Sequence, residues 1–301
     1  MSAIVNLDGR IVPPSEATVS VFDRGFLYGD SVYEVIRTYG LRPFELAAHL
    51  ARLAGSAARI GLELPWDAAR VAREIAITID ASRGGDEEDP GGAPWNVRER
   101  YVRVMMTRGA GELGIDPALA VDPRAILIVR PLHGPPLAAY RDGVKACVVG
   151  VQRISPQAMD PAAKTGNYLN SVLAVREARA AGAYEALLLD RDGFVTEGST
   201  SNVFCVRGGR LETPPLAIGI LEGVTRGVVL GLAREAGIEV VEARLRPEEL
   251  AGADEVFITS TVRELLPVTV FGDRVVGEGV PGPMYGRLHA LFRARADATA
   301  R

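Results

Sequence analysis

The alternation of apolar and polar residues predicts strands in the first part of the chain. Residues 5–12 alternate around Asp8-Gly9, a pair that favours a two-residue hairpin turn. Residues 19–39 contain two strand-like pieces, which are separated by a loop with several glycines. This loop carries Asp23, Arg24, Tyr28 and Asp30. Because loops held between strands often carry functional groups, we expect part of a site here.

Apolar residues next recur at intervals of three and four, which predicts two helices. The first runs from Phe44 to about Gly61, and its His49 and Arg52 share one face because they are three residues apart. The second helix begins at Asp67 and ends near Ile79.

Two stretches of the sequence interrupt the predicted helices and strands. Residues 83–94 combine acidic residues with glycine and proline, so we expect a solvated, mobile loop there rather than an acidic docking site. Residues 131–136 read Pro-Leu-His-Gly-Pro-Pro, which neither a helix nor a strand accommodates. We therefore predict an α/β (α+β) fold with a first domain at 1–130, an interdomain loop at 131–137 and a second domain at 138–301.

The strand predicted at residues 101–107 places polar side chains in a regular order. Alternation puts Tyr101 and Arg103 on one face and Val102 and Val104 on the other. Residues 125–129 are continuously apolar, which is typical of a strand covered on both sides.

The second half of the chain shows a similar mixture of strands, turns and helices. A loop at 155–161 precedes Lys164, and a helix-like run follows it as far as Gly182. A glycine-lined turn opens another helix, which Gly237 ends. Strands are predicted at 144–151, 186–190, 203–206 and 255–259, with a loop at 196–202 and a polar turn at Ser260-Thr261.

Composition narrows the class of protein. Hydrophobic residues make up 48% and charged residues 24% of the chain, as in soluble globular proteins. A net charge of -4 gives no broad basic field, which argues against nucleic acid as a partner. Cys147 and Cys205 lie in apolar runs without metal-ligand spacing, so we expect reduced core thiols and no metal site. No signal sequence or membrane span is evident, and we expect a cytoplasmic protein without membrane contacts.

Lysine is rare in this chain. Lysine and arginine total 34, yet only Lys145 and Lys164 are lysines. Lys145 lies near the start of a strand, where we expect an exposed side chain. Arginine is effectively never deprotonated, whereas a lysine amine can lose its proton and attack a carbonyl. Lys164 is therefore a candidate nucleophile.

Three features of the second half together suggest one kind of chemistry. Lys164 could form a Schiff base, and Gly223-Val224-Thr225 opens a helix whose N–H groups suit an anion, to which Ser260-Thr261 could also donate. Glu197 is an acid placed for a cationic partner. Each feature alone is weak, because such a glycine is usually a turn and such a glutamate is usually solvated. A lysine, an anion cradle and an acid are together what pyridoxal phosphate requires.

The order of several motifs resembles the class IV aminotransferases, the fold-type IV pyridoxal-phosphate family. The motifs are Asp23-Arg-Gly-Phe-Leu-Tyr-Gly-Asp30, Val32-Tyr-Glu-Val-Ile-Arg37, His49-Leu-Ala-Arg-Leu53, Lys164-Thr-Gly-Asn-Tyr-Leu-Asn170, Thr196-Glu-Gly-Ser199, Gly223-Val-Thr-Arg226, Thr259-Ser-Thr261 and Pro281-Gly-Pro283. The resemblance implies a smaller N-terminal α/β domain and a larger, β-barrel-like C-terminal α/β domain. It also implies a homodimer with the active site near the subunit and domain boundaries.

The resemblance also implies roles for individual residues. Lys164 would form the internal aldimine with pyridoxal 5'-phosphate and act as the general base. Glu197 would pair with the pyridine nitrogen, and Tyr168 with the ring hydroxyl. The phosphate ligands would be Arg52, Val224, Thr225 and Thr261.

Within the family, the chain is most similar to the branched-chain amino acid aminotransferases. Tyr101-Val-Arg103 resembles their carboxylate-handling strand, and Gly114-Ile115 resembles the loop that lines their side-chain pocket. Tyr28 and Tyr33 would add apolar walls with polar tips. We therefore predict transfer of an amino group between an L-branched-chain amino acid and 2-oxoglutarate.

Other branches of the family stay open as alternatives. Val104 stands where the branched-chain motif usually has proline, and Thr107-Arg-Gly109 is closer to the D-amino-acid and lyase branches. The interval from Lys164 to Tyr168 is also one residue shorter than is common. Against a D-amino-acid enzyme, residues 109–115 lack the expected Arg-x-His clamp. The alternatives are a D-amino-acid or (R)-amine transaminase, an aminodeoxychorismate lyase, and a non-catalytic scaffold of the same fold.

Overall fold

The computed structural model describes residues 3–83 and 92–300. Most of the solvated loop predicted at 83–94 lies outside these described residues. Within them, no helix has the length and apolar character needed to cross a membrane.

The chain divides into two compact units. The first unit comprises Met1–His133, Ala163–Asn167 and Thr299–Arg301, and the second comprises Gly134–Ala162 and Tyr168–Ala298. This division differs from a single boundary at 131–137, because the segment that carries Lys164 packs with the first unit.

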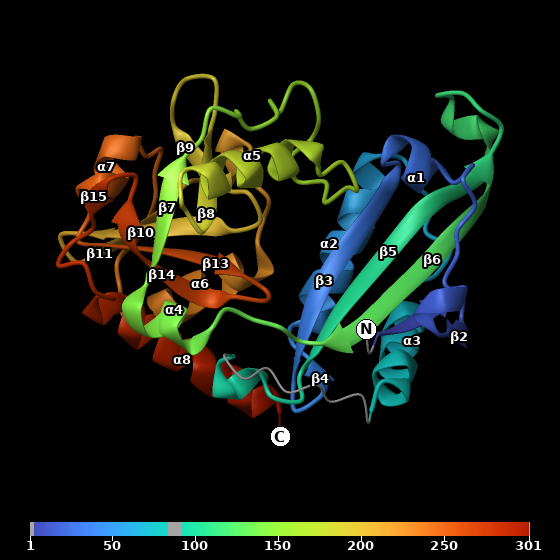
Figure 1. Cartoon of the computed structure of the whole chain (residues 1–301), viewed down its shortest axis with the longest axis horizontal. Coiled ribbons are helices and arrows are strands. Elements are labelled where there is room, and N and C mark those ends of the chain that lie inside the picture. The colour runs from blue at the N-terminus through green and yellow to red at the C-terminus, as the bar shows by residue number, and fades with distance from the viewer. Residues whose placement is uncertain (1–2, 84–91, 301) are drawn as a thin grey trace. The chain divides into compact units, whose positions relative to one another are not determined.

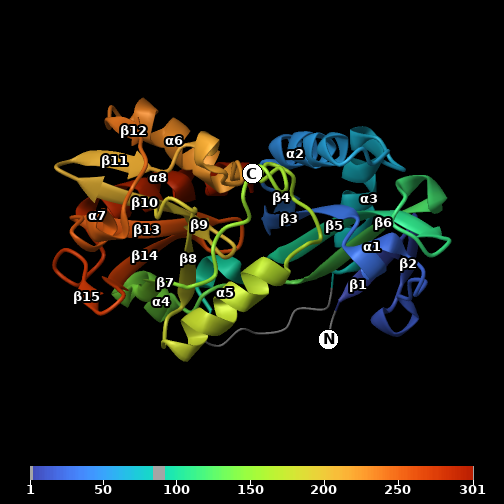
Figure 2. The same cartoon turned by 90° about the horizontal axis from the view of Figure 1, so that it is seen from above.

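A six-stranded antiparallel sheet forms the first unit, and two helices cover one of its faces (Figures 1 and 2). The strands in spatial order are β2 (Arg10–Val12), β1 (Ile4–Leu7), β6 (Ala120–Pro131), β5 (Arg100–Gly111), β3 (Ser31–Tyr39) and β4 (Arg42–Pro43). The helices are α2 (Leu46–Arg59) and α3 (Ala68–Ala81). The apolar core lies between the helices and the sheet, where Ile36, Leu53, Ile75 and Val104 are all buried.

Local sequence accounts for the hairpin and for the start of α3. Asp8 and Gly9 have φ angles of 53° and 93°, and these residue types tolerate the left-handed region that a tight hairpin turn needs. The Asp67 carboxylate caps α3 by accepting a hydrogen bond from the Arg70 N–H at 2.7 Å. Both predictions from the sequence are confirmed.

The prediction of a strand around residues 19–22 is wrong, because these residues form no strand or helix. The loop predicted after them contains a short helix, α1 (Arg24–Tyr28). The Asp23 carboxylate accepts a hydrogen bond from the Gly25 N–H at 2.7 Å, and Gly29 ends the helix with a φ of 70°. A single capped turn of this kind is too short to produce a helical periodicity.

A nine-stranded sheet forms the second unit (Figure 1). In spatial order its strands are β12 (Val240–Glu242), β11 (Arg210–Thr213), β10 (Asn202–Arg207), β13 (Glu255–Ser260), β14 (Glu264–Phe271), β7 (Val144–Val148), β8 (Glu185–Leu189) and β9 (Val195–Gly198), and β15 (Arg274–Val275) pairs with β14. The pairs β14–β7, β7–β8 and β11–β12 are parallel, and the others are antiparallel.

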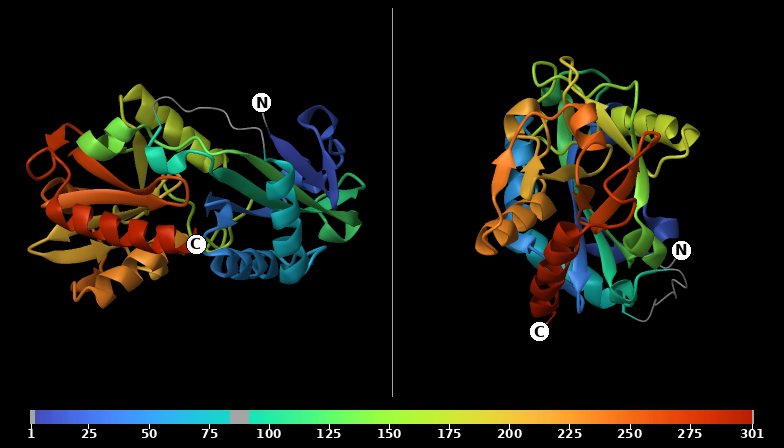
Figure 3. Two further views of the ribbon diagram at one scale, coloured as in Figure 1. Left: turned by 90° about the horizontal axis from the view of Figure 1, so that it is seen from below. Right: turned by 90° about the vertical axis from the view of Figure 1, so that its left-hand side faces the viewer.

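Helices pack against this sheet, and α8 is the longest of those described (Figure 3). The ring centroids of Phe257 in β13 and Tyr285 in α8 are 6.1 Å apart. On the β7–β8 side, Ala174 and Ala178 of α5 pack on Ala186. The helices are α4 (Leu137–Asp142), α5 (Leu169–Ala180), α6 (Val224–Glu235), α7 (Pro247–Ala251) and α8 (Pro283–Thr299), and short 3-10 turns occur at Pro14–Glu16, Pro94–Asn96, Pro117–Leu119 and Leu216–Ile218.

The loop predicted at 196–202 is partly wrong, because Glu197 lies in strand β9. All four residues of β9 are buried although two of them are polar. The Thr196 hydroxyl donates a hydrogen bond to the Leu188 carbonyl at 2.8 Å, which satisfies it inside the sheet. An alternation of apolar residues cannot reveal a strand whose buried positions are polar.

Candidate active site

Lys164 is held against the start of β3 by its backbone. Its carbonyl accepts a hydrogen bond from the Tyr33 N–H at 3.0 Å, and its own N–H donates to the Ser56 hydroxyl at 3.0 Å. The Gly166 N–H donates to the Ser31 carbonyl at 2.9 Å. These contacts fix the backbone on both sides of the lysine, so β3 and α2 set the direction of its side chain.

The Lys164 amino group meets Tyr33. The Nζ atom lies 3.3 Å from the Tyr33 hydroxyl and 4.4 Å from the centroid of its ring. The Arg103 guanidinium lies over the same ring at 4.0 Å. The Lys164 amino group and the Arg103 guanidinium therefore contact the same buried phenol, both over its ring and Lys164 also at its hydroxyl.

Tyr101 and Arg103 share one face of β5, as the alternation predicts. Both are half-buried, whereas Val102 and Val104 are buried against the helices. The Arg130 guanidinium lies 4.7 Å from the centroid of the Tyr101 ring. The Tyr33, Tyr101 and Arg103 side chains thus lie on the sheet face opposite α2 and α3.

Arg52 is bound by a carboxylate. Its Nε and Nη2 atoms each lie 2.7 Å from an oxygen of Glu34, which is fully buried. The Nδ1 atom of His49 lies 2.7 Å from the same carboxylate. Burial by itself raises the pKa of Glu34, but the hydrogen bonds from Arg52 and His49 outweigh it and bring that pKa to about 2. Glu34 is therefore a stable anion, and it orients the Arg52 guanidinium.

Tyr28 and Arg24 hold the loop that follows β5. The Arg24 guanidinium donates to the Gly114 carbonyl at 2.7 Å and to the Ile115 carbonyl at 3.0 Å. The Tyr28 hydroxyl accepts a hydrogen bond from the Gly114 N–H at 3.4 Å. The loop that carries Gly114-Ile115 is consequently tied to α1.

Arg108 and Arg37 donate hydrogen bonds to neighbouring groups of the first unit. The Arg108 Nε lies 2.7 Å from Asp30, and its two terminal nitrogens donate to the Ile60 and Gly61 carbonyls. Buried Arg37 donates to the Asn96 side chain at 3.0 Å. Arg108 thus joins β5 to the end of α2.

In the second unit, Glu197 is surrounded by donors. One carboxylate oxygen lies 2.9 Å from Nη2 of Arg153. The other accepts hydrogen bonds from the Leu221 N–H at 3.0 Å and from the Asn202 amide at 3.4 Å. This buried carboxylate is held in place by three different segments of the unit.

Val224 and Thr225 occupy the first turn of α6. Gly223 is the N-cap and supplies no side-chain cap, so the first N–H groups of the helix suit an anion. The turn also lies very close to β10, because a Cβ atom added to Gly223 would lie 1.9 Å from Oδ1 of Asn202. Any side chain at this position would require the Asn202 side chain to move.

Thr261 lies in the turn that follows β13. The neighbouring Thr259 hydroxyl is buried and has no hydrogen-bond partner within the described part of the chain. Tyr168, the last of the predicted residues, is the N-cap of α5. Within the second unit, an uncapped helix start and threonine hydroxyls are donors that suit a phosphate group. In the first unit, the Lys164 amine suits an aldehyde.

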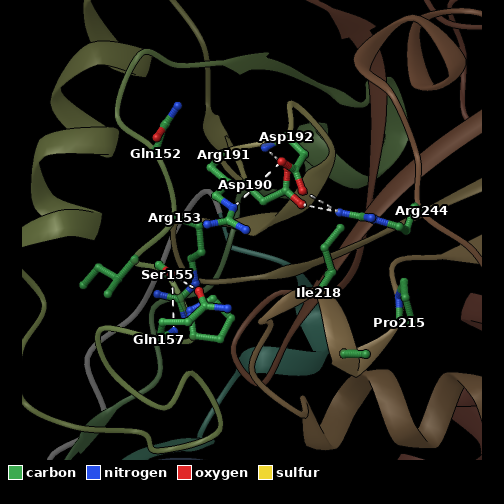
Figure 4. A pocket seen from close by; sticks show the side chains of 13 residues that line it. Gln152, Arg153, Ser155, Gln157, Asp190, Arg191, Asp192, Pro215, Ile218 and Arg244 are labelled. Atoms are coloured by element: carbon green, nitrogen blue, oxygen red, sulfur yellow. Dashed lines mark hydrogen bonds and ion pairs between the residues drawn. The ribbon is translucent and has the colours of Figure 1, made fainter.

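A pocket of about 430 Å³ lies elsewhere in the second unit (Figure 4). Arg244 points toward Asp190 and Asp192 at its rim, with distances of 3.0 Å and 3.4 Å. Arg153 lines this pocket and also reaches Glu197, but none of the residues predicted for the site lines it. Over residues 3–83 and 92–300 there is no group of three or more metal-ligating side chains that could hold an ion.

The partners of the predicted residues are not evident from the sequence. In the sequence, Glu34 is only a carboxylate inside a strand motif. Its role in orienting Arg52 depends on the two side chains meeting in the folded chain. No sequence pattern marks Arg153 as a partner of Glu197, because 44 positions separate the two residues and the chain has many arginines.

Comparisons with known proteins agree on one family. The model of the amino-transferase class IV family matches residues 31–271. A Methanocaldococcus jannaschii protein assigned as a branched-chain amino acid aminotransferase is 40% identical over 289 residues, which cover 96% of this chain and 95% of that protein. The D-alanine aminotransferase of Bacillus licheniformis is 36% identical over 280 residues, which cover 93% of this chain and 92% of that protein.

Solved structures show the same fold. The crystal structure of the T.th. branched-chain amino acid aminotransferase, complexed with N-(5'-phosphopyridoxyl)-L-glutamate, is similar with a TM-score of 0.88 at 32% identity. The similarity covers 98% of this chain and 94% of that one. The predicted fold class, with two mixed α/β parts, is therefore confirmed.

Proposed function

The chain belongs to the class IV aminotransferases, and from this premise we propose that it moves an amino group between an L-branched-chain amino acid and 2-oxoglutarate with pyridoxal 5'-phosphate. One observation carries the proposal. Lys164, one of only two lysines in the chain, places its amino group 3.3 Å from the Tyr33 hydroxyl with Arg103 over the same ring.

Each predicted site residue has a role in this proposal. Lys164 would hold the cofactor covalently, Glu197 would pair with its pyridine nitrogen, and Tyr168 would contact its ring hydroxyl. The phosphate ligands would be Arg52, Val224, Thr225 and Thr261. When bound, pyridoxal phosphate supplies an aldehyde and a ring that accepts electrons.

Lys164 is the residue that would handle the reacting proton. Once the substrate amine has displaced it from the cofactor, its amino nitrogen would take the proton from the α-carbon of the substrate and hold it as an ammonium group, while the Tyr33 hydroxyl keeps that nitrogen in position through the 3.3 Å contact. Arg153 and two N–H donors hold the Glu197 carboxylate in place. A fixed anion there favours a protonated pyridine nitrogen.

Arg103, with Tyr28, Tyr33 and Tyr101, forms the substrate side of the site. The Arg103 guanidinium makes a ring contact and no carboxylate pair among the described residues, so a substrate carboxylate can bind it. The tyrosine rings suit an aliphatic side chain.

A D-amino-acid transaminase is the second candidate, and the relative from Bacillus licheniformis supports it. Two observations favour the L-specific function. Residues 109–115 contain neither arginine nor histidine, and Arg108 is bound to Asp30 and to the end of α2.

Spectroscopy and a substrate panel test the proposal. The purified protein should show a visible absorption band that borohydride bleaches, and Lys164→Ala should lose both the band and the turnover. A colourless protein that takes up no pyridoxal phosphate would favour the non-catalytic scaffold. Strong turnover of D-alanine or an (R)-arylamine with 2-oxoglutarate, without L-leucine turnover, would overturn the substrate assignment.

The proposal includes a homodimer. Apolar side chains gather around α1 and the loop tied to it: Phe22 (49% exposed), Phe26 (68%), Leu113 (68%) and Ile115 (87%). We define these four residues as the α1 patch. A second copy of the chain is the partner that such a patch suits best. A cytoplasmic location is supported by Cys147 and Cys205, which are both buried thiols.

A further inference from the structure

Glu185 is a buried carboxylate that no proposed role uses. It begins β8, and its side chain is 1% exposed. One oxygen accepts hydrogen bonds from the Ser199 N–H at 3.1 Å and from the Ser199 hydroxyl. The other accepts one from the Ser201 hydroxyl at 3.1 Å. Both serines belong to the turn at 199–201, which directly follows the strand that carries Glu197.

Arg263 joins this turn to another part of the proposed site. Its Nη1 lies 2.6 Å from Glu185 and donates to the Thr200 hydroxyl at 3.0 Å. Arg263 lies two residues after Thr261, in the turn that follows β13. One guanidinium therefore connects the turn next to the proposed pyridine partner with the turn of a proposed phosphate ligand.

The contacts leave little room for another arrangement. The Gly198 N–H donates to the Ser201 carbonyl at 2.7 Å, which closes the turn. A Cβ atom added to Gly198 would lie 2.1 Å from the Ser201 hydroxyl and 3.2 Å from the Glu185 carboxyl carbon. The position of Glu197 thus depends on the packing of the turn over Glu185.

We propose that Glu185 and Arg263 are positioning residues, which fix Glu197 relative to Thr261 so that ring and phosphate of the cofactor can bind at once. This inference rests on the proposed function. Arg263 pairs with the buried Glu185 carboxylate from the opposite turn. Loss of either partner lets the two turns move independently, and small displacements of binding groups are costly.

Binding of two cofactor forms separates this role from a direct phosphate contact. The apoprotein is titrated with pyridoxal 5'-phosphate and with pyridoxal, which lacks the phosphate, and absorbance reports both dissociation constants. R263M and E185Q should weaken both ligands by about 10-fold to 100-fold, as a displacement of the binding groups predicts. Thr261→Ala should weaken the phosphorylated form alone. The double variant E185Q/R263M should bind both ligands more tightly than R263M alone, because the neutral amide that replaces the carboxylate needs no cation.

Arg141→Met is the matched control, since it removes an exposed arginine whose partner, Asp142, is also exposed. If the wild type binds pyridoxal phosphate while R263M and E185Q bind both ligands as tightly as Arg141→Met, the inference is wrong. If the wild type itself binds no cofactor, the proposed function fails instead. Should R263M not fold, the near-isosteric E185Q decides through the same two titrations.

Discussion

The hydroxyl of Tyr33 lies 3.3 Å from the amino group of Lys164, although 131 positions separate the two residues. The contact exists because Lys164 pairs with β3 through its own carbonyl, next to Tyr33. The following residue, Glu34, points to the other face of the sheet, where it binds Arg52. One strand thus positions both the nucleophile and a proposed phosphate ligand.

Removal of the Tyr33 hydroxyl should slow turnover. We expect Tyr33→Phe to lower kcat by up to about 10-fold, since a hydrogen bond contributes about 0.5–1.5 kcal/mol. The ring stays in place, so the contact with Arg103 and the affinity for substrate should change little. Single-turnover kinetics with L-leucine would measure the effect.

Tyr285→Phe is the control for this change. The Tyr285 hydroxyl is buried without a hydrogen-bond partner in the described residues, so its loss should leave kcat unchanged. An equal loss in both variants would contradict a specific role of Tyr33.

Stability should depend on the ionisation of Glu34. Its pKa falls from 4.5 to about 2 in the folded protein, so its contribution is fully present above pH 4.5 and disappears as the pH falls toward 2. Glu34→Gln should therefore lose about 3 kcal/mol of unfolding free energy at pH 7. The difference between variant and wild type should shrink through pH 4 and vanish near pH 2. Urea unfolding at these three pH values tests this, and a constant difference would contradict it.

Local sequence was sufficient to predict the elements whose pattern is regular. The hairpin at Asp8-Gly9, the faces of β5 and the start of α3 at Asp67 follow from turn chemistry, alternation and capping. Lys164 stood out because lysine is so rare here.

Contacts between distant segments could not be predicted in the same way. The sequence predicts a loop at Glu197 because its strand lacks apolar alternation. No sequence pattern marks Arg153, because its pairing with Glu197 depends on the folded sheet. The helix α1 depends on a cap and on the hydrogen bonds of Arg24 to a loop 90 residues away. Tertiary contacts, not local preference, decide these cases.

The start of α6 should tolerate only glycine at its N-cap. In Gly223→Ala the new methyl would lie 1.9 Å from Asn202, whose amide also contacts Glu197 and the Leu221 carbonyl. We expect a loss of cofactor affinity of about 10-fold or more, as misplacement of binding groups predicts. Gly231→Ala in the same helix meets nothing within 4 Å and should instead stabilise the protein by up to about 1 kcal/mol. Equal cofactor binding by the two variants would argue against the proposed cradle.

Arg103 should matter more for the acidic substrate than for the aliphatic one. The acceptor 2-oxoglutarate carries two carboxylates and L-leucine one, so loss of a guanidinium should raise the Michaelis constant more for the acceptor. We expect an increase of about 10-fold in Arg103→Met, with a smaller change for L-leucine. Steady-state kinetics would compare it with Arg42→Met, which replaces an exposed arginine in β4. A uniform change in both Michaelis constants would place Arg103 outside carboxylate recognition.

Disruption of the α1 patch should dissociate the proposed homodimer. Phe26 is 68% exposed, and Phe26→Asp would place a charge in the α1 patch. Burying that charge in an apolar interface without a partner is costly, so sedimentation at micromolar concentration should give the mass of a single chain. Val275→Asp makes the same kind of change at a 60% exposed position in β15 of the second unit, and it should leave the mass unchanged. If Phe26→Asp sediments like the wild type, the contact between copies must use a different surface, because an unpaired carboxylate buried in this patch would not be tolerated.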